Sequence, residues 1–366
     1  MSFLKEIEEY KNFDFIDFWN KVDKNNIQKV LAKNKLDKND YLILLAPQAE
    51  ELLEEIAQKA NFLTTQYFGK TVQLFTPLYL ANYCVNNCVY CGFKVNNELK
   101  RHKLNEIELR AEAEVISRTG LNHILILTGE DQKQTPVSYI VQAIKILKEY
   151  FSSVSIEIYP LTVQEYQEVK NAGCDGMTIY QEVYNQETYP KMHLSGPKTN
   201  YLFRLDAPER ACQANLRTVT IGALLGLYYW RIEAFFTGIH ALYLQKKYKD
   251  VEIAIAPPRI RPQLGSFKPT EYVIDKNIVQ YITAFRLLMP NNGITVSSRE
   301  HASFRDNLIK LGLTKMSAGV STAVGGHSSE QETGQFDIAD ERSVDEISTA
   351  LYQSGYQPIF KDWFNI

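Results

Sequence analysis

The sequence predicts an α/β protein built on a (β/α)8 barrel of the TIM type with an N-terminal helical extension. Three observations support this prediction. Residues 1–70 have helical periodicity, and short apolar runs then alternate with amphipathic segments over residues 71–318. The alternating stretch has roughly the 250 residues that such a barrel needs. A doubly wound sheet would show the same alternation, so it stays open as an alternative fold.

The segment before the barrel carries an apolar stripe at helical spacing. The residues of that stripe are Ala49, Leu52, Leu53, Ile56 and Ala57. Pro47 precedes them, where a proline suits the start of a helix. We therefore expect residues 1–70 to form a helical extension to the barrel.

Eight apolar runs of strand length follow, each bounded by Gly, Pro, Asn or Ser. The expected strands are residues 72–80, 123–128, 154–159, 175–180, 217–222, 251–256, 293–298 and 313–318. The expected helices between them are residues 106–119, 138–151, 162–173, 199–215, 223–247, 276–289 and 300–311. The barrel domain is thus predicted over residues 71–318, and residues 319–366 are expected to form a polar C-terminal tail that packs on it.

The composition is that of a soluble globular enzyme. The chain is 45% hydrophobic and 23% charged, with a formal net charge of −3, so neither nucleic acid nor an anionic membrane is an expected partner. No apolar run approaches the roughly 18–20 residues of a membrane span. The N-terminus is too acidic for a secretory signal. We expect the protein to be cytoplasmic.

The most informative feature is a cluster of cysteines. Cys84, Cys88 and Cys91 have the spacing C-x3-C-x2-C in a loop directly after the first barrel strand. Structural zinc and iron–sulfur clusters usually take four protein ligands. Three thiolates would leave one iron of a cluster open to another ligand. Cys174 and Cys212 lack metal-ligand spacing and are expected to be small buried residues.

The cysteine spacing, with Tyr90 before the third cysteine, resembles the signature of radical S-adenosylmethionine (SAM) enzymes. In that superfamily three cysteines hold a 4Fe–4S cluster, and SAM chelates the fourth iron through its amino and carboxylate groups. Electron transfer then splits SAM and yields a radical that abstracts hydrogen. The resemblance implies that Cys84, Cys88 and Cys91 are the cluster ligands and that the backbone of Tyr90 lies against the adenine.

The resemblance extends to a set of residues expected to bind SAM. Gly129 and Glu130 end the second strand and resemble the motif that meets the methionyl amino group. Glu157 is a candidate for the ribose hydroxyls, with pairing to Arg204 as the alternative. The remaining members of the set are Tyr159, Glu182 and Arg204. All of these positions except Arg204 lie at or just beyond expected strand ends, where the active sites of barrels are found.

Longer stretches resemble one subfamily, the radical SAM tyrosine lyases. These are Phe68-Gly-Lys70, Pro77-Leu-Tyr-Leu-Ala-Asn82, Cys91-Gly-Phe93, Tyr180-Gln-Glu-Val-Tyr184, His193-Leu-Ser-Gly-Pro-Lys198, Arg204-Leu-Asp-Ala-Pro-Glu-Arg210, Gly222-Ala-Leu-Leu-Gly-Leu227, Trp230-Arg231, Pro258-Arg-Ile-Arg-Pro262, Ser298-Arg-Glu300, Ser317-Ala-Gly319, Gln335-Phe-Asp-Ile-Ala-Asp340 and Arg342-Ser343. The subfamily cleaves the Cα–Cβ bond of L-tyrosine to p-cresol and 2-iminoacetate (dehydroglycine). The motifs recur in order across the whole barrel.

Two branches of the subfamily fit: one supplies the thiazole of thiamine, and the other matures the diiron hydrogenase cofactor. The maturase carries further C-terminal cysteines for a second cluster, whereas no cysteine follows Cys212 here. The thiamine branch is therefore the prediction. A related radical SAM enzyme with another aromatic substrate, and a non-catalytic iron–sulfur or zinc scaffold, are the alternatives.

The tyrosine carboxylate needs a fixed cation inside a barrel, because an unpaired buried charge is costly. Arg299, at the end of the seventh strand, is the candidate, with Ser298 as a neighbouring hydrogen-bond donor. Pairing of Arg299 with Glu300 or with a helix end is the alternative. The resemblance further implies two protein partners: thiazole synthase, and an electron donor such as flavodoxin or ferredoxin.

Overall fold

The computed structural model describes residues 2–328 and 334–361 and contains a closed barrel of eight parallel strands. The strands are β1 Thr71–Ala81, β2 His123–Thr128, β3 Ser153–Glu157, β4 Cys174–Glu182, β5 Thr218–Ala223, β6 Glu252–Ile255, β7 Gly293–Val296 and β8 Lys315–Ser317. They pair in chain order, and β1 closes the barrel because it pairs with both β2 and β8. The predicted fold class is confirmed, and the doubly wound alternative is wrong.

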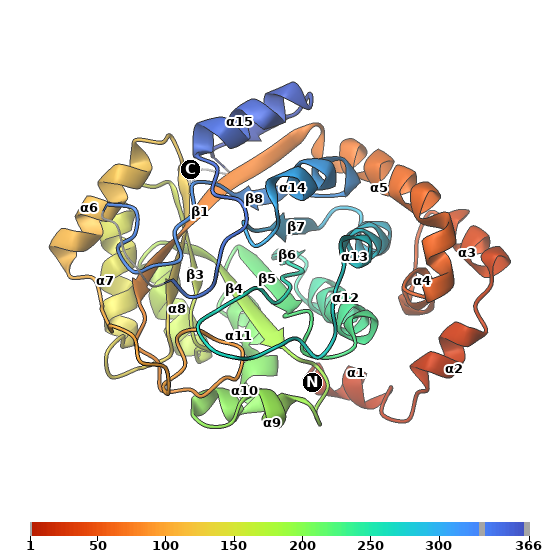
Figure 1. Cartoon of the computed structure of the whole chain (residues 1–366), viewed down its shortest axis with the longest axis horizontal. Helices are drawn as coiled ribbons and strands as arrows, with labels where there is room; N and C mark the ends of the chain where they lie inside the picture. The colour runs from red at the N-terminus through yellow and green to blue at the C-terminus, as the bar shows by residue number, and fades with distance from the viewer. Residues whose placement is uncertain (1, 329–333, 362–366) are drawn as a thin grey trace.

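The helices that follow the strands form the outer layer (Figure 1). They are α6 Glu106–Ser117, α7 Val137–Leu147, α8 Val163–Asn171, α9 Tyr189–Met192, α10 Tyr201–Leu205, α11 Ala207–Gln213, α12 Trp230–Lys247, α13 Asp275–Leu288 and α14 Ala302–Leu308. The single helix expected over 199–215 is two helices, with Pro208 in the first turn of α11. The helix expected from residue 223 begins at Trp230, because Ala223 still belongs to β5.

The N-terminal region is helical, as predicted. It contains α1 Leu4–Glu8, α2 Phe15–Asn20, α3 Lys24–Leu31, α4 Lys38–Leu44, a 3-10 turn at Pro47–Leu52 and α5 Leu53–Phe68. The hydroxyl of Tyr41 donates to the carbonyl of Ala234 at 3.0 Å. The ring of Phe3 stacks on His240 with centroids 4.0 Å apart. These helices therefore pack on the side of the barrel that α12 and α13 cover (Figure 1).

The segment after β8 is more ordered than a polar tail. It contains α15 Val344–Gln353 and a short strand, β9 Gln357–Ile359, which pairs in parallel with the start of β1. β9 could not be predicted from the sequence, because three residues with a central proline carry no strand pattern. Before α15 the chain runs beside the ends of the barrel strands, where Ala339 N donates to Ser298 O at 2.8 Å.

No helix within the described ranges is long and apolar enough to cross a membrane.

Candidate active site

The cysteine loop leaves the C-terminal end of β1 and forms one wall of a cavity. Cys88 is buried, whereas Cys84 and Cys91 are half-buried. All three line this cavity together with Gly129, Glu130 and other residues from the ends of β2, β3 and β4. The predicted cluster ligands and most of the predicted SAM-binding residues are therefore brought to one place.

The loop is held in place from two sides. On one side, Val85 N donates to Glu130 O at 3.0 Å, and Asn86 Nδ2 donates to Glu130 Oε2 at 2.6 Å. On the other side, Val89 N donates to Met192 O at 3.1 Å. Hydrogen bonds from the protein itself therefore hold the loop in position.

The structure shows why residue 129 must be a glycine. A Cβ atom at this position would lie 2.2 Å from the carbonyl oxygen of Tyr83 and 3.1 Å from Cβ of Cys84. Only glycine allows the end of β2 to come this close to the cysteine loop. The glycine therefore positions the first cysteine, whatever it does for a bound ligand.

The three thiols suit a cluster better than a single ion. Among the described residues, no group of three or more His, Cys, Asp or Glu side chains is arranged to hold one metal ion. A zinc site needs its ligands around one centre, whereas cluster ligands bind separate irons. Burial raises the pKa of the Cys88 thiol to about 12 and also raises that of Cys91. Bound iron would stabilise the thiolates.

Tyr90 anchors the loop with its side chain. The ring is buried in a second apolar cluster with Val183, Met192 and Leu224. Its hydroxyl lies 2.8 Å from Nε2 of His193. The ring and hydroxyl of Tyr90 therefore pack against the protein and hold the cysteine loop in place.

Glu182 is the most strongly paired carboxylate of the cavity. Its Oε1 accepts from Lys198 Nζ at 2.7 Å and from Arg204 Nη2 at 3.2 Å. Burial opposes its ionisation, but Lys198 and Arg204 hold the pKa of Glu182 below its usual value. Arg204 also donates to Tyr180 O at 2.7 Å. The alternative in which Arg204 pairs with Glu157 is therefore wrong.

Tyr159 lines the same cavity. Its hydroxyl donates to the carbonyl of Thr135 at 2.6 Å, and burial raises its pKa. The hydroxyl is thus engaged with the loop after β2.

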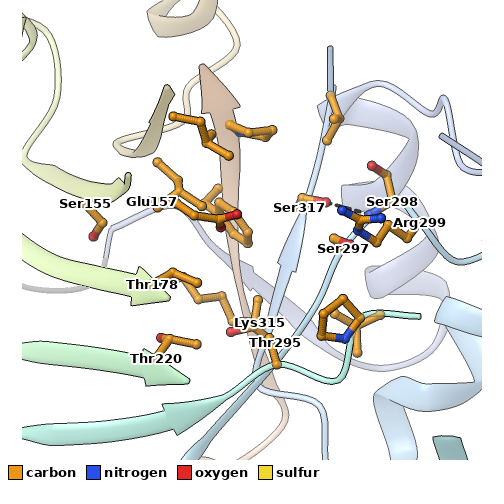
Figure 2. Close-up of a pocket in the computed structure, with 18 of the residues that line it drawn as sticks. Ser155, Glu157, Thr178, Thr220, Thr295, Ser297, Ser298, Arg299, Lys315 and Ser317 are labelled. Atoms are coloured by element: carbon orange, nitrogen blue, oxygen red, sulfur yellow. Dashed lines mark hydrogen bonds between the residues drawn. The ribbon is translucent and has the colours of Figure 1, made fainter. Parts of the chain in front are cut away.

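Glu157 and Arg299 border a second chamber inside the barrel. Figure 2 shows Glu157 with Ser155, Thr178 and Thr220 on one side of this pocket and Arg299 on the other. Burial raises the pKa of Glu157 to about 7, although the nearby charge of Arg299 opposes that rise. Both residues also line the cavity that reaches Cys91 and Glu182. The chamber and that cavity therefore adjoin at this pair.

Arg299 is available for an anionic ligand. Its guanidinium carbon lies 3.4 Å from the centroid of the Phe336 ring. Over residues 2–328 and 334–361, no carboxylate is within ion-pair distance of it. Glu300 is bound instead by Arg259, whose Nε lies 2.9 Å from both of its carboxylate oxygens. The alternative in which Arg299 pairs with Glu300 is therefore wrong.

Ser298 lies beside Arg299 and is fixed by its backbone. Its N–H donates to Ser317 Oγ at 2.9 Å, and its carbonyl accepts from the amides of Ala339 and Asp340. The C-terminal segment therefore holds the end of β7 in position.

The wall of the barrel chamber is apolar on one side and polar on the other. Apolar side chains from β1 and β2 face hydroxyl side chains from β3, β4, β5, β7 and β8; the lining includes Phe75, Leu125 and Leu127, and Ser155, Thr178, Thr220, Thr295 and Ser317. Barrel interiors are usually filled by bulky aliphatic residues. A wall of this kind suits an aromatic molecule that carries polar groups.

Sequence reasoning missed four residues of the site: Tyr79, Lys198, Gln335 and Phe336. Each lies in a stretch that carried the family resemblance, but no spacing rule marked it. Their contacts depend on how distant segments meet in space.

A parallel barrel with three cysteines in the loop after its first strand defines a class of protein, the radical SAM enzymes. Residues 78–237 match the model of the radical SAM superfamily, and residues 257–357 match that of the biotin and thiamin synthesis associated domain. Radical SAM enzymes use a 4Fe–4S cluster and SAM.

The particular family follows from the relatives. The chain is 38% identical to 2-iminoacetate synthase of Escherichia coli (strain K12) over 92% of this chain and 90% of that protein. It is 37% identical to 2-iminoacetate synthase of Salmonella typhimurium over the same shares. The FeFe-hydrogenase maturase HydG of Carboxydothermus hydrogenoformans has a similar structure, with a TM-score of 0.87, 34% identity and coverage of 94% of this chain and 82% of that chain. The chain belongs to the 2-iminoacetate synthase family of radical SAM enzymes.

Proposed function

We propose that the protein is a 2-iminoacetate synthase, a tyrosine lyase that cleaves the Cα–Cβ bond of L-tyrosine to 2-iminoacetate and p-cresol. The 2-iminoacetate would enter the thiazole moiety of thiamine. The observation that carries this proposal is the 38% identity to an enzyme of that name over nearly the whole of both chains. The site geometry supports it, because Arg299, which has no carboxylate partner among the described residues, lines a chamber with both apolar and hydroxyl side chains.

Cys84, Cys88 and Cys91 would hold the cluster and leave one iron open for SAM. When bound, the cluster and SAM supply an electron and a carbon-centred radical that takes hydrogen from the substrate. The rest of the chemistry depends on placement, since hydrogen abstraction requires near contact between the reacting atoms.

The chain would hold SAM through the polar rim of the cysteine cavity. Glu130 offers carboxylate oxygens near Gly129 to the methionyl ammonium, and Glu157 offers its carboxylate to the ribose hydroxyls. The backbone of Tyr90 would meet the adenine. Tyr159, Glu182 and Arg204 would complete this wall, with Glu182 kept ionised by the two cations that bind it.

Tyrosine would lie in the chamber between Glu157 and Arg299. The guanidinium of Arg299 would bind the substrate carboxylate in two hydrogen bonds, which fixes its orientation as well as its position. Ser298 would contribute a further hydrogen bond. The aromatic ring would then lie along the wall shared by apolar and hydroxyl side chains.

The barrel would also exclude water from the radical chemistry. The segment around Gln335 and Phe336 borders the cysteine cavity through Gln335 and the barrel chamber through Phe336. The loop after β6 around Pro258 borders the barrel chamber. Asp337 N donates to Pro262 O at 2.9 Å, so these two covering segments are joined.

Three further points belong to this proposal. The product is an unstable imine, which favours direct consumption by thiazole synthase. A one-electron donor such as flavodoxin or ferredoxin would reduce the cluster. The cytoplasm is the expected location.

The decisive experiment is anaerobic reconstitution of the full chain with iron and sulfide, followed by dithionite, SAM and tyrosine. We expect 5′-deoxyadenosine, p-cresol and glyoxylate, the hydrolysis product of 2-iminoacetate. A metal-binding scaffold would release no 5′-deoxyadenosine. A related enzyme with another substrate would release 5′-deoxyadenosine but no p-cresol, and either result would overturn the proposal.

A further inference from the structure

Gln335 lies between the cysteine loop and the substrate chamber. Its Nε2 is a hydrogen-bond donor to Cys91 Sγ at 3.8 Å. Its Oε1 accepts from the hydroxyl of Tyr79 at 2.8 Å. The three residues come from β1, the cysteine loop and the C-terminal segment, so folding alone brings them together.

Tyr79 determines which end of the amide faces the sulfur. Burial raises the pKa of the Tyr79 hydroxyl, which therefore stays protonated and donates. In the structure this hydroxyl donates to the amide oxygen of Gln335, which leaves the amide nitrogen for another acceptor. The amide nitrogen is then directed to Cys91.

The backbone of this segment is fitted closely to the cysteine loop. Gln335 N donates to Thr322 O, and Thr322 Oγ1 donates to Phe336 O, both at 3.1 Å. A Cβ at Gly92 would lie 2.4 Å from the carbonyl oxygen of Gln335. The glycine after Cys91 therefore lets the segment approach, and the side chain of Gln335 starts from a fixed point.

We propose that Gln335 is a positioning residue for the cluster: its amide donates an N–H···S hydrogen bond to the Cys91 sulfur, and Tyr79 fixes the orientation of that amide. This inference rests on the proposed function, because it requires a cluster on Cys91. Hydrogen bonds to cluster sulfurs are among the factors that set reduction potential. A donor stabilises the more negative, reduced cluster, so Gln335 raises the potential and makes reduction easier.

The test is a reductive titration of the reconstituted full chain, followed by electron paramagnetic resonance. Gln335→Leu removes the donor and should lower the midpoint potential. Gln335→Glu should lower it further, because a carboxylate cannot donate and brings negative charge. Tyr79→Phe keeps the amide but frees it to turn, so a smaller decrease is expected. Gln357→Leu, an exposed position in β9, is the matched control and should leave the potential unchanged.

Iron and sulfide content is measured first for every variant. If the wild-type chain forms no cluster, the proposed function fails and this inference fails with it. If Gln335→Leu carries a full cluster with the wild-type potential, this inference alone is overturned. Should Gln335→Leu bind less iron, Tyr79→Phe decides, and an unchanged potential in that variant overturns the inference.

Discussion

Arg299 lies over the ring of Phe336, with its guanidinium carbon 3.4 Å from the ring centroid. Arg299 follows β7, whereas Phe336 belongs to the C-terminal segment beyond β8. Stacking on an aromatic ring orients a guanidinium plane and leaves its N–H edge free for a carboxylate. The arrangement makes Arg299 an oriented cation that the protein itself does not neutralise by an ion pair in the described residues.

The first prediction concerns this cation. Arg299→Lys keeps the charge but loses the planar, two-pronged contact, so the substrate carboxylate would no longer be fixed in orientation. We expect p-cresol formation to fall by about 100-fold or more, in line with the cost of a small misplacement at a reacting centre. Uncoupled formation of 5′-deoxyadenosine should remain. Arg118→Lys, at the exposed C-cap of α6, is the control. Unchanged p-cresol formation in Arg299→Lys would reject the assignment.

The second prediction is a pH dependence that arises from Glu157. Burial raises the pKa of this carboxyl to about 7, so it is largely neutral below that pH and ionised above it. The ionised form is the stronger acceptor for ribose hydroxyls. The affinity for SAM should therefore rise as the pH increases from about 6 to 8, a range set by that pKa.

Equilibrium binding of SAM to the reconstituted protein measures this effect. Glu157→Gln stays neutral throughout and should remove most of the pH dependence, with the largest loss of affinity at high pH. Equal pH profiles for the two proteins would show that Glu157 does not bind SAM.

The barrel could be predicted from the sequence because its signals are local. The apolar run at residues 123–128 is one such signal, and the cysteine spacing is another. Each depends only on residues that are close together in the sequence. The contacts of Arg204 and Arg299 could not be predicted from the sequence, because they depend on how β4, β7 and the C-terminal segment meet in space. Lys198 and Gln335 were missed for the same reason, and β9 because it is stabilised by pairing with β1 and not by its own pattern.

The third prediction tests the close approach at Gly129. In Gly129→Ala the new methyl group would meet the carbonyl oxygen of Tyr83 at 2.2 Å, so the cysteine loop must move. We expect a marked loss of iron after reconstitution, measured per folded chain. Gly355→Ala is the control, because its φ of +78° strains an alanine while the space around it is open. The free energy of unfolding of Gly355→Ala should be lower by about 1–2 kcal/mol, and this variant should retain its iron. Equal iron contents would contradict the role given to Gly129.

The fourth prediction concerns the buried contact between Lys198 and Glu182. The side chains are 14% and 8% exposed, and Arg204 is the second cation on the same carboxylate. Lys198→Met would leave one cation where two now bind. Breaking a buried pair typically costs about 3–5 kcal/mol, and the remaining Arg204 should reduce that cost. We expect a decrease of about 2–3 kcal/mol in the free energy of unfolding of the cluster-free protein, measured with urea.

Lys21→Met is the matched control for that measurement, because Lys21 pairs with Asp17 at side-chain exposures of 73% and 56%. An exposed pair contributes at most about 1 kcal/mol, so the control should unfold almost as the wild type does. The comparison separates the loss of a lysine from the loss of a buried ion pair. If both variants lost the same small amount, Lys198 would not be needed to keep Glu182 ionised. The wall of the cysteine cavity would then depend on Arg204 alone.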